Sequence, residues 1–133
     1  MRVFLASARG TPDSVLAEPE VRITEALKLS GFDPKVIRAK AEWDASFGRL
    51  GGWEAWTTHI AQGVDYTDRK PLFDLIVCLN ETVGKATAQI VQKAMEVQKN
   101  VLLYQEKQFF RVLRVDSVDS DNWQSGWRLA IDP

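Results

Sequence analysis

The chain has 133 residues, of which 45% are hydrophobic and 26% are charged. These values exclude a disordered or fibrous chain and predict one globular domain that buries roughly two thirds of its unfolded surface. Seventeen Lys and Arg against eighteen Asp and Glu leave a net charge of -1. Because duplex nucleic acid and anionic membranes attract clustered basic residues, we expect neither as a partner.

Cysteine content and hydropathy indicate the cellular compartment of the protein. The single cysteine, Cys78, cannot form a disulfide within the chain, and it lies in the apolar run 75–79, where a buried, inert thiol is usual. Residues 1–7 are too short for the apolar region of a signal peptide. No run reaches the roughly eighteen apolar residues of a membrane span. The sequence therefore predicts a cytoplasmic protein.

The first part of the chain predicts a strand, a helix and a second strand. Residues 2–7 are mostly apolar and are followed by the strand-ending segment 9–12. Pro19, flanked by two glutamates, predicts a helix start, because proline suits the first turn and acids favour its positive end. The helix is expected to end at Gly31, and a second strand is expected over 35–39.

Residues 40–72 form an insertion rich in aromatic residues and broken by glycines. Trp53, Trp56 and Ile60 fit one face of a helix that runs to about Gln62. The insertion carries four large aromatic residues, namely Trp43, Phe47, Trp53 and Trp56. They form either a lid over a ligand or a second small core, and we favour the core because aromatic side chains mostly serve burial.

The second half of the chain predicts a strand–helix–strand unit. Residues 73–79 are apolar apart from Asp74, which predicts a central strand covered on both faces. After the turn 80–84, a helix of about sixteen residues is expected, and a strand over 101–104 follows. The buried stripe of this helix is expected to comprise Val83, Ala86, Ile90, Ala94 and Val97. Such a unit implies parallel strands and a right-handed crossover.

The C-terminal segment predicts a pair of strands within 109–133. Residues 109–115 form the first strand, and Trp127, Leu129 and Ile131 alternate with Arg128 and Ala130 as in an edge strand. The whole chain, 1–133, is thus expected to be a single α/β domain. Its central, mostly parallel sheet of four to five strands is flanked by helices in a Rossmann-like or flavodoxin-like arrangement, with an extra C-terminal edge strand.

In open parallel sheets, ligands bind beyond the carboxyl ends of the strands. Three segments occupy such positions here, namely 7–10, 80–82 and 104–106. The first, Ser7-Ala8-Arg9-Gly10, offers a hydroxyl, a guanidinium and a glycine that lets backbone N–H groups approach a ligand. These groups can hold a phosphate or a carboxylate. A surface turn with a solvated arginine explains the same residues equally well.

Other motifs are incomplete. The segment 84–87 resembles the end of a phosphate-binding P-loop, but Leu79 stands where its first glycine is required. His59 is the only histidine and has no partner at metal-ligand spacing, so a structural role is expected. The aspartates within 116–121 lack the glycine and the closing glutamate of a calcium loop. We expect no metal and no cofactor.

The order of these segments resembles the nucleoside 2-deoxyribosyltransferase-like family, which includes deoxynucleoside 5′-monophosphate N-glycosidases. The first strand and the loop 7–10 are similar to the family's short strand and Gly/Ala-Ser-x-Arg-Gly loop. Asp74 opens the central strand, Gly84 starts the following helix, and a basic residue, Lys99, precedes the next apolar strand, as in the family. The resemblance covers about residues 2–104.

In this family a glutamate on the glycine-started helix attacks the anomeric carbon of the sugar, and an aspartate before the central strand positions it. At the matching turn this chain has Gln89 or Ile90, and neither is a nucleophile. Asp65 lies near the position of the supporting aspartate. Glu81, at the end of the central strand, could bring a carboxylate to the same pocket.

The resemblance therefore implies a nucleotide- or nucleoside-binding protein that is non-catalytic or weakly catalytic and that forms a homodimer. The expected ligand contacts are Ser7, Arg9 and Gly10 for the phosphate, Asn80, Glu81 and Gln89 for the sugar, and Trp53 or Trp56 for the base.

Two alternatives remain open. One is an N-glycosidase or deoxyribosyltransferase that cleaves the base–sugar bond, with Glu81 and Asp65 as catalytic residues. The other is a protein-interaction module without a ligand, in which Trp123 and Trp127 form a contact surface.

Overall fold

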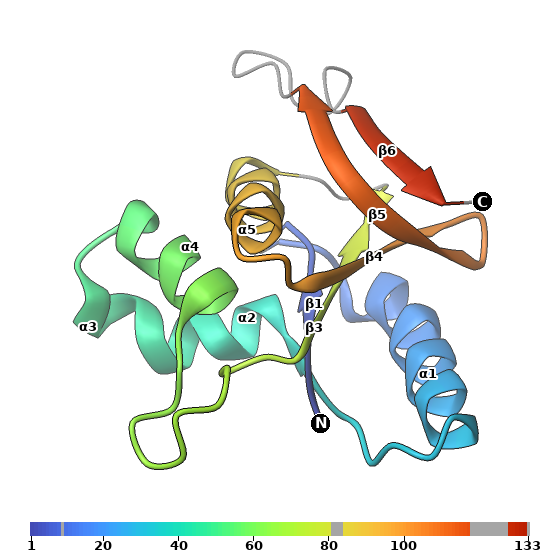
Figure 1. Cartoon of the computed structure of the whole chain (residues 1–133), viewed down its shortest axis with the longest axis horizontal. Helices are drawn as coiled ribbons and strands as arrows, with labels where there is room; N and C mark the ends of the chain where they lie inside the picture. Colours follow the sequence, from blue (N-terminus) through green and yellow to red (C-terminus); the bar gives the residue numbers. More distant parts are fainter. Residues whose placement is uncertain (9, 81–83, 118–127, 133) are drawn as a thin grey trace.

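Six strands form one mixed sheet in the order β2-β1-β3-β4-β5-β6 (Figure 1). The strands are β1 (Arg2–Ala6), β2 (Lys35–Arg38), β3 (Leu75–Leu79), β4 (Asn100–Gln105), β5 (Gln108–Ser117) and β6 (Arg128–Asp132). The computed structural model describes residues 1–8, 10–80, 84–117 and 128–132. The α/β class is confirmed. The mostly parallel sheet is confirmed in part, since β1 to β4 are parallel whereas β5 and β6 are antiparallel.

Strands β1 and β3 are buried because they are apolar on both faces. All five residues of β3 are buried, and β1 is buried from Val3 to Ala6. The two strands pair in parallel from Val3 opposite Leu75 to Ala6 opposite Cys78. Burial raises the pKa of the Cys78 thiol to about 12, which keeps it protonated and unreactive. This pair of strands forms the centre of the parallel part of the sheet.

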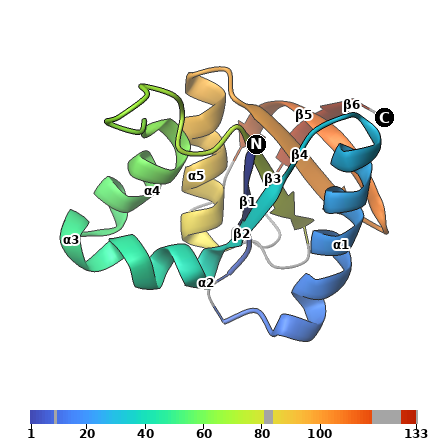
Figure 2. The same cartoon turned by 90° about the horizontal axis from the view of Figure 1, so that it is seen from below.

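Helices cover both faces of the sheet (Figure 2). On one face α1 (Asp13–Leu29) packs Leu16 and Ile23 onto alternate residues of β1 and β3. On the other face lie α4 (Trp53–Gln62) and α5 (Lys85–Glu96), which pack against Phe4 and Ile76. Among the described residues, no helix is both long and apolar enough to cross a membrane.

Helix α1 begins earlier than its sequence predicts. It starts at Asp13, directly after Pro12, so Pro19 lies inside the helix and the predicted start at Pro19 is wrong. An internal proline removes one backbone hydrogen bond and crowds the preceding turn. Pro19 is nevertheless buried. We attribute its tolerance to this burial, which the sequence signal for a helix start does not reveal.

The insertion is helical from its beginning. Helix α2 (Ala39–Glu42), a π-helical turn called η1 (Trp43–Phe47) and α3 (Gly48–Leu50) follow one another directly. Gly51 and Gly52 then adopt φ values of 82° and 147°, which favour glycine and allow the chain to reverse into α4. The predicted helix that ends at about Gln62 is confirmed as α4, Trp53–Gln62.

A tight turn joins β4 to β5. Because Gln105 pairs with Gln108, the loop contains only Glu106 and Lys107. Their φ values are 50° and 64°, as a type I′ hairpin requires at both central positions. Such turns usually contain Asn-Gly, so two charged residues with Cβ atoms adopt an unfavourable backbone conformation here.

Candidate functional site

A cavity of about 550 Å³ lies on the α4–α5 face of the sheet, at the carboxyl end of β1. Its walls come from Ser7 and Ala8 after β1, from Ala39 at the start of α2, and from the first turns of α4 and α5. We call it the indole cavity because Trp43, Trp53 and Trp56 also line it. The strand order reverses between β1 and β3, the usual position of a ligand site in open α/β sheets.

The tryptophans of the indole cavity have different surroundings. Trp56 is only 3% exposed, and its Nε1 donates a hydrogen bond to Ser46 Oγ over 3.0 Å. Trp43 stacks on Phe47 with 3.6 Å between ring centroids. Trp53 is 47% exposed, and its ring centroid lies 4.4 Å from that of Trp43. The insertion thus contains a small core, and Trp53 at its edge leaves about half of its surface accessible.

Lys93 of α5 holds the first turns of α4 in place. Its Nζ donates to the backbone oxygen and to Oε1 of Glu54, both at 3.0 Å. The same nitrogen lies 2.9 Å from Thr57 Oγ1 and 2.8 Å from Thr58 Oγ1. Because Trp53 and Glu54 begin α4 and line the indole cavity, this cluster of hydrogen bonds fixes one wall of the cavity.

The first turn of α5 forms another wall of the cavity. Gly84 precedes the helix, and within the described part of the chain no side chain caps this end. The first N–H groups of a helix lack intrahelical acceptors and carry a partial positive charge. The ammonium-bearing Lys85 lines the cavity beside them. A Cβ atom at Gly84 would lie 3.7 Å from Ala8 Cβ, so the loop after β1 directly approaches this helix end.

Four of the residues predicted to form the site meet in the indole cavity, namely Ser7, Trp53, Trp56 and Gln89. Gly10 lines a neighbouring cavity of about 410 Å³, to which Trp43 also contributes. Asn80 is half-buried after β3 and is not among the residues that line the indole cavity. Arg9 and Glu81, predicted for the phosphate and the chemical step, lie outside the described residues, as do Trp123 and Trp127.

Asp65 lies beyond the amino end of β3, at the opposite end of the strands from the indole cavity. It belongs to the loop between α4 and β3, which Figure 1 shows at the same end of the molecule as the N-terminus. The backbone N–H of Thr67 donates to Asp65 Oδ1 over 2.7 Å, and this hydrogen bond is the main cause that lowers the pKa of Asp65. The structure therefore does not bring Asp65 together with the indole cavity, which lies at the carboxyl ends of the strands.

Sequence reasoning missed Glu54, Lys85 and Thr87 as cavity residues. A usable signal exists, because a helix that follows a parallel strand begins at the carboxyl edge of the sheet and turns its first residues towards the ligand site. His59 lies outside the cavity, with its Nε2 3.7 Å from Glu42 Oε1. Over residues 1–8, 10–80, 84–117 and 128–132, no three His, Cys, Asp or Glu side chains are placed to hold a metal ion.

Comparison with known proteins identifies no relative. No protein-family model, no curated protein and no solved structure matches this chain. The function of the indole cavity is therefore inferred from its residues.

Proposed function

We propose that this protein binds a nucleoside or nucleotide in the indole cavity, with the base against Trp53 and the phosphate at the start of α5. The observation that carries the proposal is the presence, in one cavity, of a half-exposed indole and the start of a twelve-residue helix that no described side chain caps. A planar heterocycle joined to an anion matches this pair of features. The volume of about 550 Å³ lies within the range of roughly 300–1,000 Å³ typical of small-molecule sites.

The base would stack on the indole of Trp53. Trp43 packs against this indole, and Lys93 anchors the turn that carries it, so little side-chain freedom is lost on binding. Stacking of a base on an aromatic side chain contributes about 1–3 kcal/mol. The stacking surface therefore supplies affinity for any base, and polar groups of the cavity select among bases.

The phosphate would bind at the first turn of α5. Helix N-termini bind anions through their backbone N–H groups, and the Lys85 ammonium adds a full positive charge. The Ser7 hydroxyl, on the loop after β1, can donate a further hydrogen bond. The parallel order β2-β1-β3-β4 supports the proposal, because flavodoxin-like sheets have this order and bind a phosphorylated ligand at the same switch point.

Binding without efficient cleavage fits the cavity better than glycoside hydrolysis. Cleavage of a base–sugar bond calls for a carboxylate beside the sugar. Of the described cavity residues Glu54 alone is a carboxylate, and its Oε1 accepts a hydrogen bond from Lys93. Gln89 carries an amide, which is not a nucleophile. An N-glycosidase that uses Glu54 is therefore the alternative to be tested.

Calorimetric titration with nucleosides and their 5′-monophosphates tests the proposal. Trp53→Leu should weaken binding of both classes about tenfold, which corresponds to about 1.4 kcal/mol. Lys85→Met should weaken binding of the monophosphates but not of the nucleosides. Tyr66→Leu and Lys28→Met, at exposed positions away from the cavity, serve as matched controls and should leave both affinities unchanged.

Two results would overturn the proposal: no binding of any compound, or equal binding by all four variants. Chromatography of the incubated mixtures measures release of free base. Release that Glu54→Gln abolishes would establish the N-glycosidase instead of the binding protein.

A further inference from the structure

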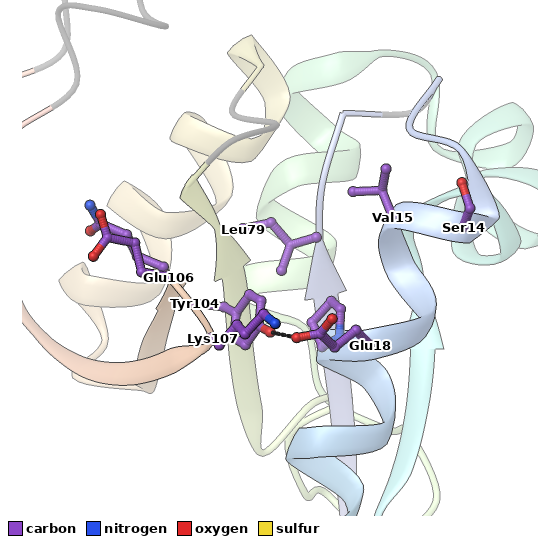
Figure 3. A pocket seen from close by; sticks show the side chains of 9 residues that line it. Ser14, Val15, Glu18, Leu79, Tyr104, Glu106 and Lys107 are labelled. Atoms are coloured by element: carbon purple, nitrogen blue, oxygen red, sulfur yellow. Dashed lines mark hydrogen bonds between the residues drawn. The ribbon is translucent and has the colours of Figure 1, made fainter.

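A second cavity, of about 320 Å³, lies on the other face of the sheet (Figure 3). It is enclosed by α1, by the carboxyl end of β3 and by the turn between β4 and β5. We call it the α1 cavity. It shares no lining residue with the indole cavity, and Leu79, which lines it, belongs to the core on the α1 face. An inference about its ligand is therefore independent of the proposed nucleotide site.

The α1 cavity has an apolar end and a charged end. Figure 3 shows Leu79 and Val15 at one end of the space, where both side chains are aliphatic. The side chains of Glu18, Tyr104 and Lys107 gather at the other end. A ligand that fills this space needs an aliphatic body and a compact charged group.

Glu18 presents a fixed negative charge. Tyr104 Oη donates to Glu18 Oε1 over 2.9 Å, and Arg22 Nε donates to the same oxygen over 3.1 Å. The hydrogen bond from Tyr104 is the main cause that lowers the pKa of Glu18, so its carboxylate is ionised at neutral pH. Among the described residues, no hydrogen bond reaches Glu18 Oε2, which leaves that oxygen for a donor on a ligand.

Lys107 supplies a positive charge, and its backbone adopts a conformation that is unfavourable for a residue with a Cβ atom. With Glu106 it forms the two-residue turn in which both φ values are positive, where Asn-Gly would be unstrained. The charge of Lys107 contributes to the lowered pKa of Glu18, which indicates that both charged groups lie near the same part of the cavity. Residues that break a local backbone rule are concentrated at functional sites.

We propose that the α1 cavity binds a free α-amino acid with an aliphatic side chain. The ammonium group of the ligand would bind Glu18 Oε2, the carboxylate would bind Lys107, and the side chain would contact Leu79 and Val15. A zwitterion fits because the negative charge of Glu18 repels a purely anionic ligand and the positive charge of Lys107 repels a purely cationic one. The aliphatic end gives the ligand its orientation.

Calorimetric titration of the full chain with L-leucine tests this proposal. L-leucine should bind at least tenfold more tightly than L-leucine methyl ester, which lacks the carboxylate, and than N-acetyl-L-leucine, which lacks the ammonium. Glu18→Gln and Lys107→Gln should each weaken binding of L-leucine at least tenfold. The controls are Glu25→Gln and Lys28→Gln, at exposed positions of α1 that do not line the cavity.

Thermal unfolding of each unliganded variant shows whether it is folded. Val15→Asp, at an exposed position, provides a second way to block the cavity. L-leucine binding that Trp53→Leu leaves unchanged but Val15→Asp removes would support the α1 cavity as the site. The proposal is overturned if L-leucine does not bind, if the two blocked analogues bind equally well, or if Glu18→Gln and Lys107→Gln both bind like the wild type.

Discussion

Replacement of Lys93 by methionine should destabilise the protein more than the loss of a surface ion pair would. The Lys93 side chain is 15% exposed, and its Nζ lies within hydrogen-bonding distance of four acceptors on the first turns of α4. Methionine keeps most of the aliphatic stem, so the change mainly removes the ammonium group. Thr57, one of the residues bonded to Lys93, is fully buried and would lose a charged donor.

The magnitude follows from the burial of each partner. The Glu54 carboxylate is 84% exposed, so its ion pair with Lys93 contributes about 0.5 kcal/mol or less. Hydrogen bonds from a charged donor to less accessible acceptors contribute about 1.5–3 kcal/mol. We therefore expect Lys93→Met to lower the free energy of unfolding by about 2 kcal/mol. For a chain of 133 residues this corresponds to a decrease in Tm of about 8 °C.

Urea unfolding followed by tryptophan fluorescence measures this loss, with Glu54→Gln as the matched control. Glu54→Gln removes only the exposed charge and should change the free energy of unfolding by about 0.5 kcal/mol or less. If the two variants were equally destabilised, the ion pair would be the main interaction and the reasoning would be refuted. Lys93→Met should also weaken nucleotide binding, because Trp53 lies on the anchored turn.

Two further predictions concern pH and the β4–β5 turn. Burial lowers the pKa of His59 more than Glu42 raises it, so the unfolded chain binds more protons than the folded chain around pH 6.5. Stability should therefore fall as the pH is lowered from about 7.5 through about 6.5. The urea midpoint of His59→Gln should fall less over this range, and an equal fall would contradict the prediction. The double variant Glu106→Asn, Lys107→Gly should raise the free energy of unfolding by about 1–2 kcal/mol, because it relieves two left-handed residues. A destabilised double variant, measured by the same assay, would show that the turn is not strained.

The strands and one helix of this fold could be predicted because their signals are local. The run from Leu75 to Leu79 contains only apolar residues and became a fully buried strand, as expected. The helix from Trp53 to Gln62 follows two glycines and has a clear apolar face, and its C-terminal end agrees with the prediction. Such segments depend little on the rest of the chain, so periodicity and turn residues are sufficient.

Features that depend on distant contacts could not be predicted. Pro19 inside α1 is tolerated where it is buried, and no local signal reports that burial. Tyr104 and Glu18 are 86 positions apart, so the hydrogen bond that shapes the α1 cavity is not visible in the sequence. The four aromatic residues of the insertion were expected to be either a core or a lid, whereas tertiary packing buries Trp56 and leaves Trp53 half-exposed.

The central position of β1 has a consequence for biosynthesis. The N-terminal strand pairs with β3, and the contact between Arg2 and Asp74 spans 72 positions. While the ribosome is still translating the insertion, one edge of β1 has no partner, and its apolar residues are available to chaperones or to other nascent chains. The central strands can join only after Leu79 has left the exit tunnel, and closure of so long a loop slows folding. Both cavities therefore form late, after most of the chain has been synthesised.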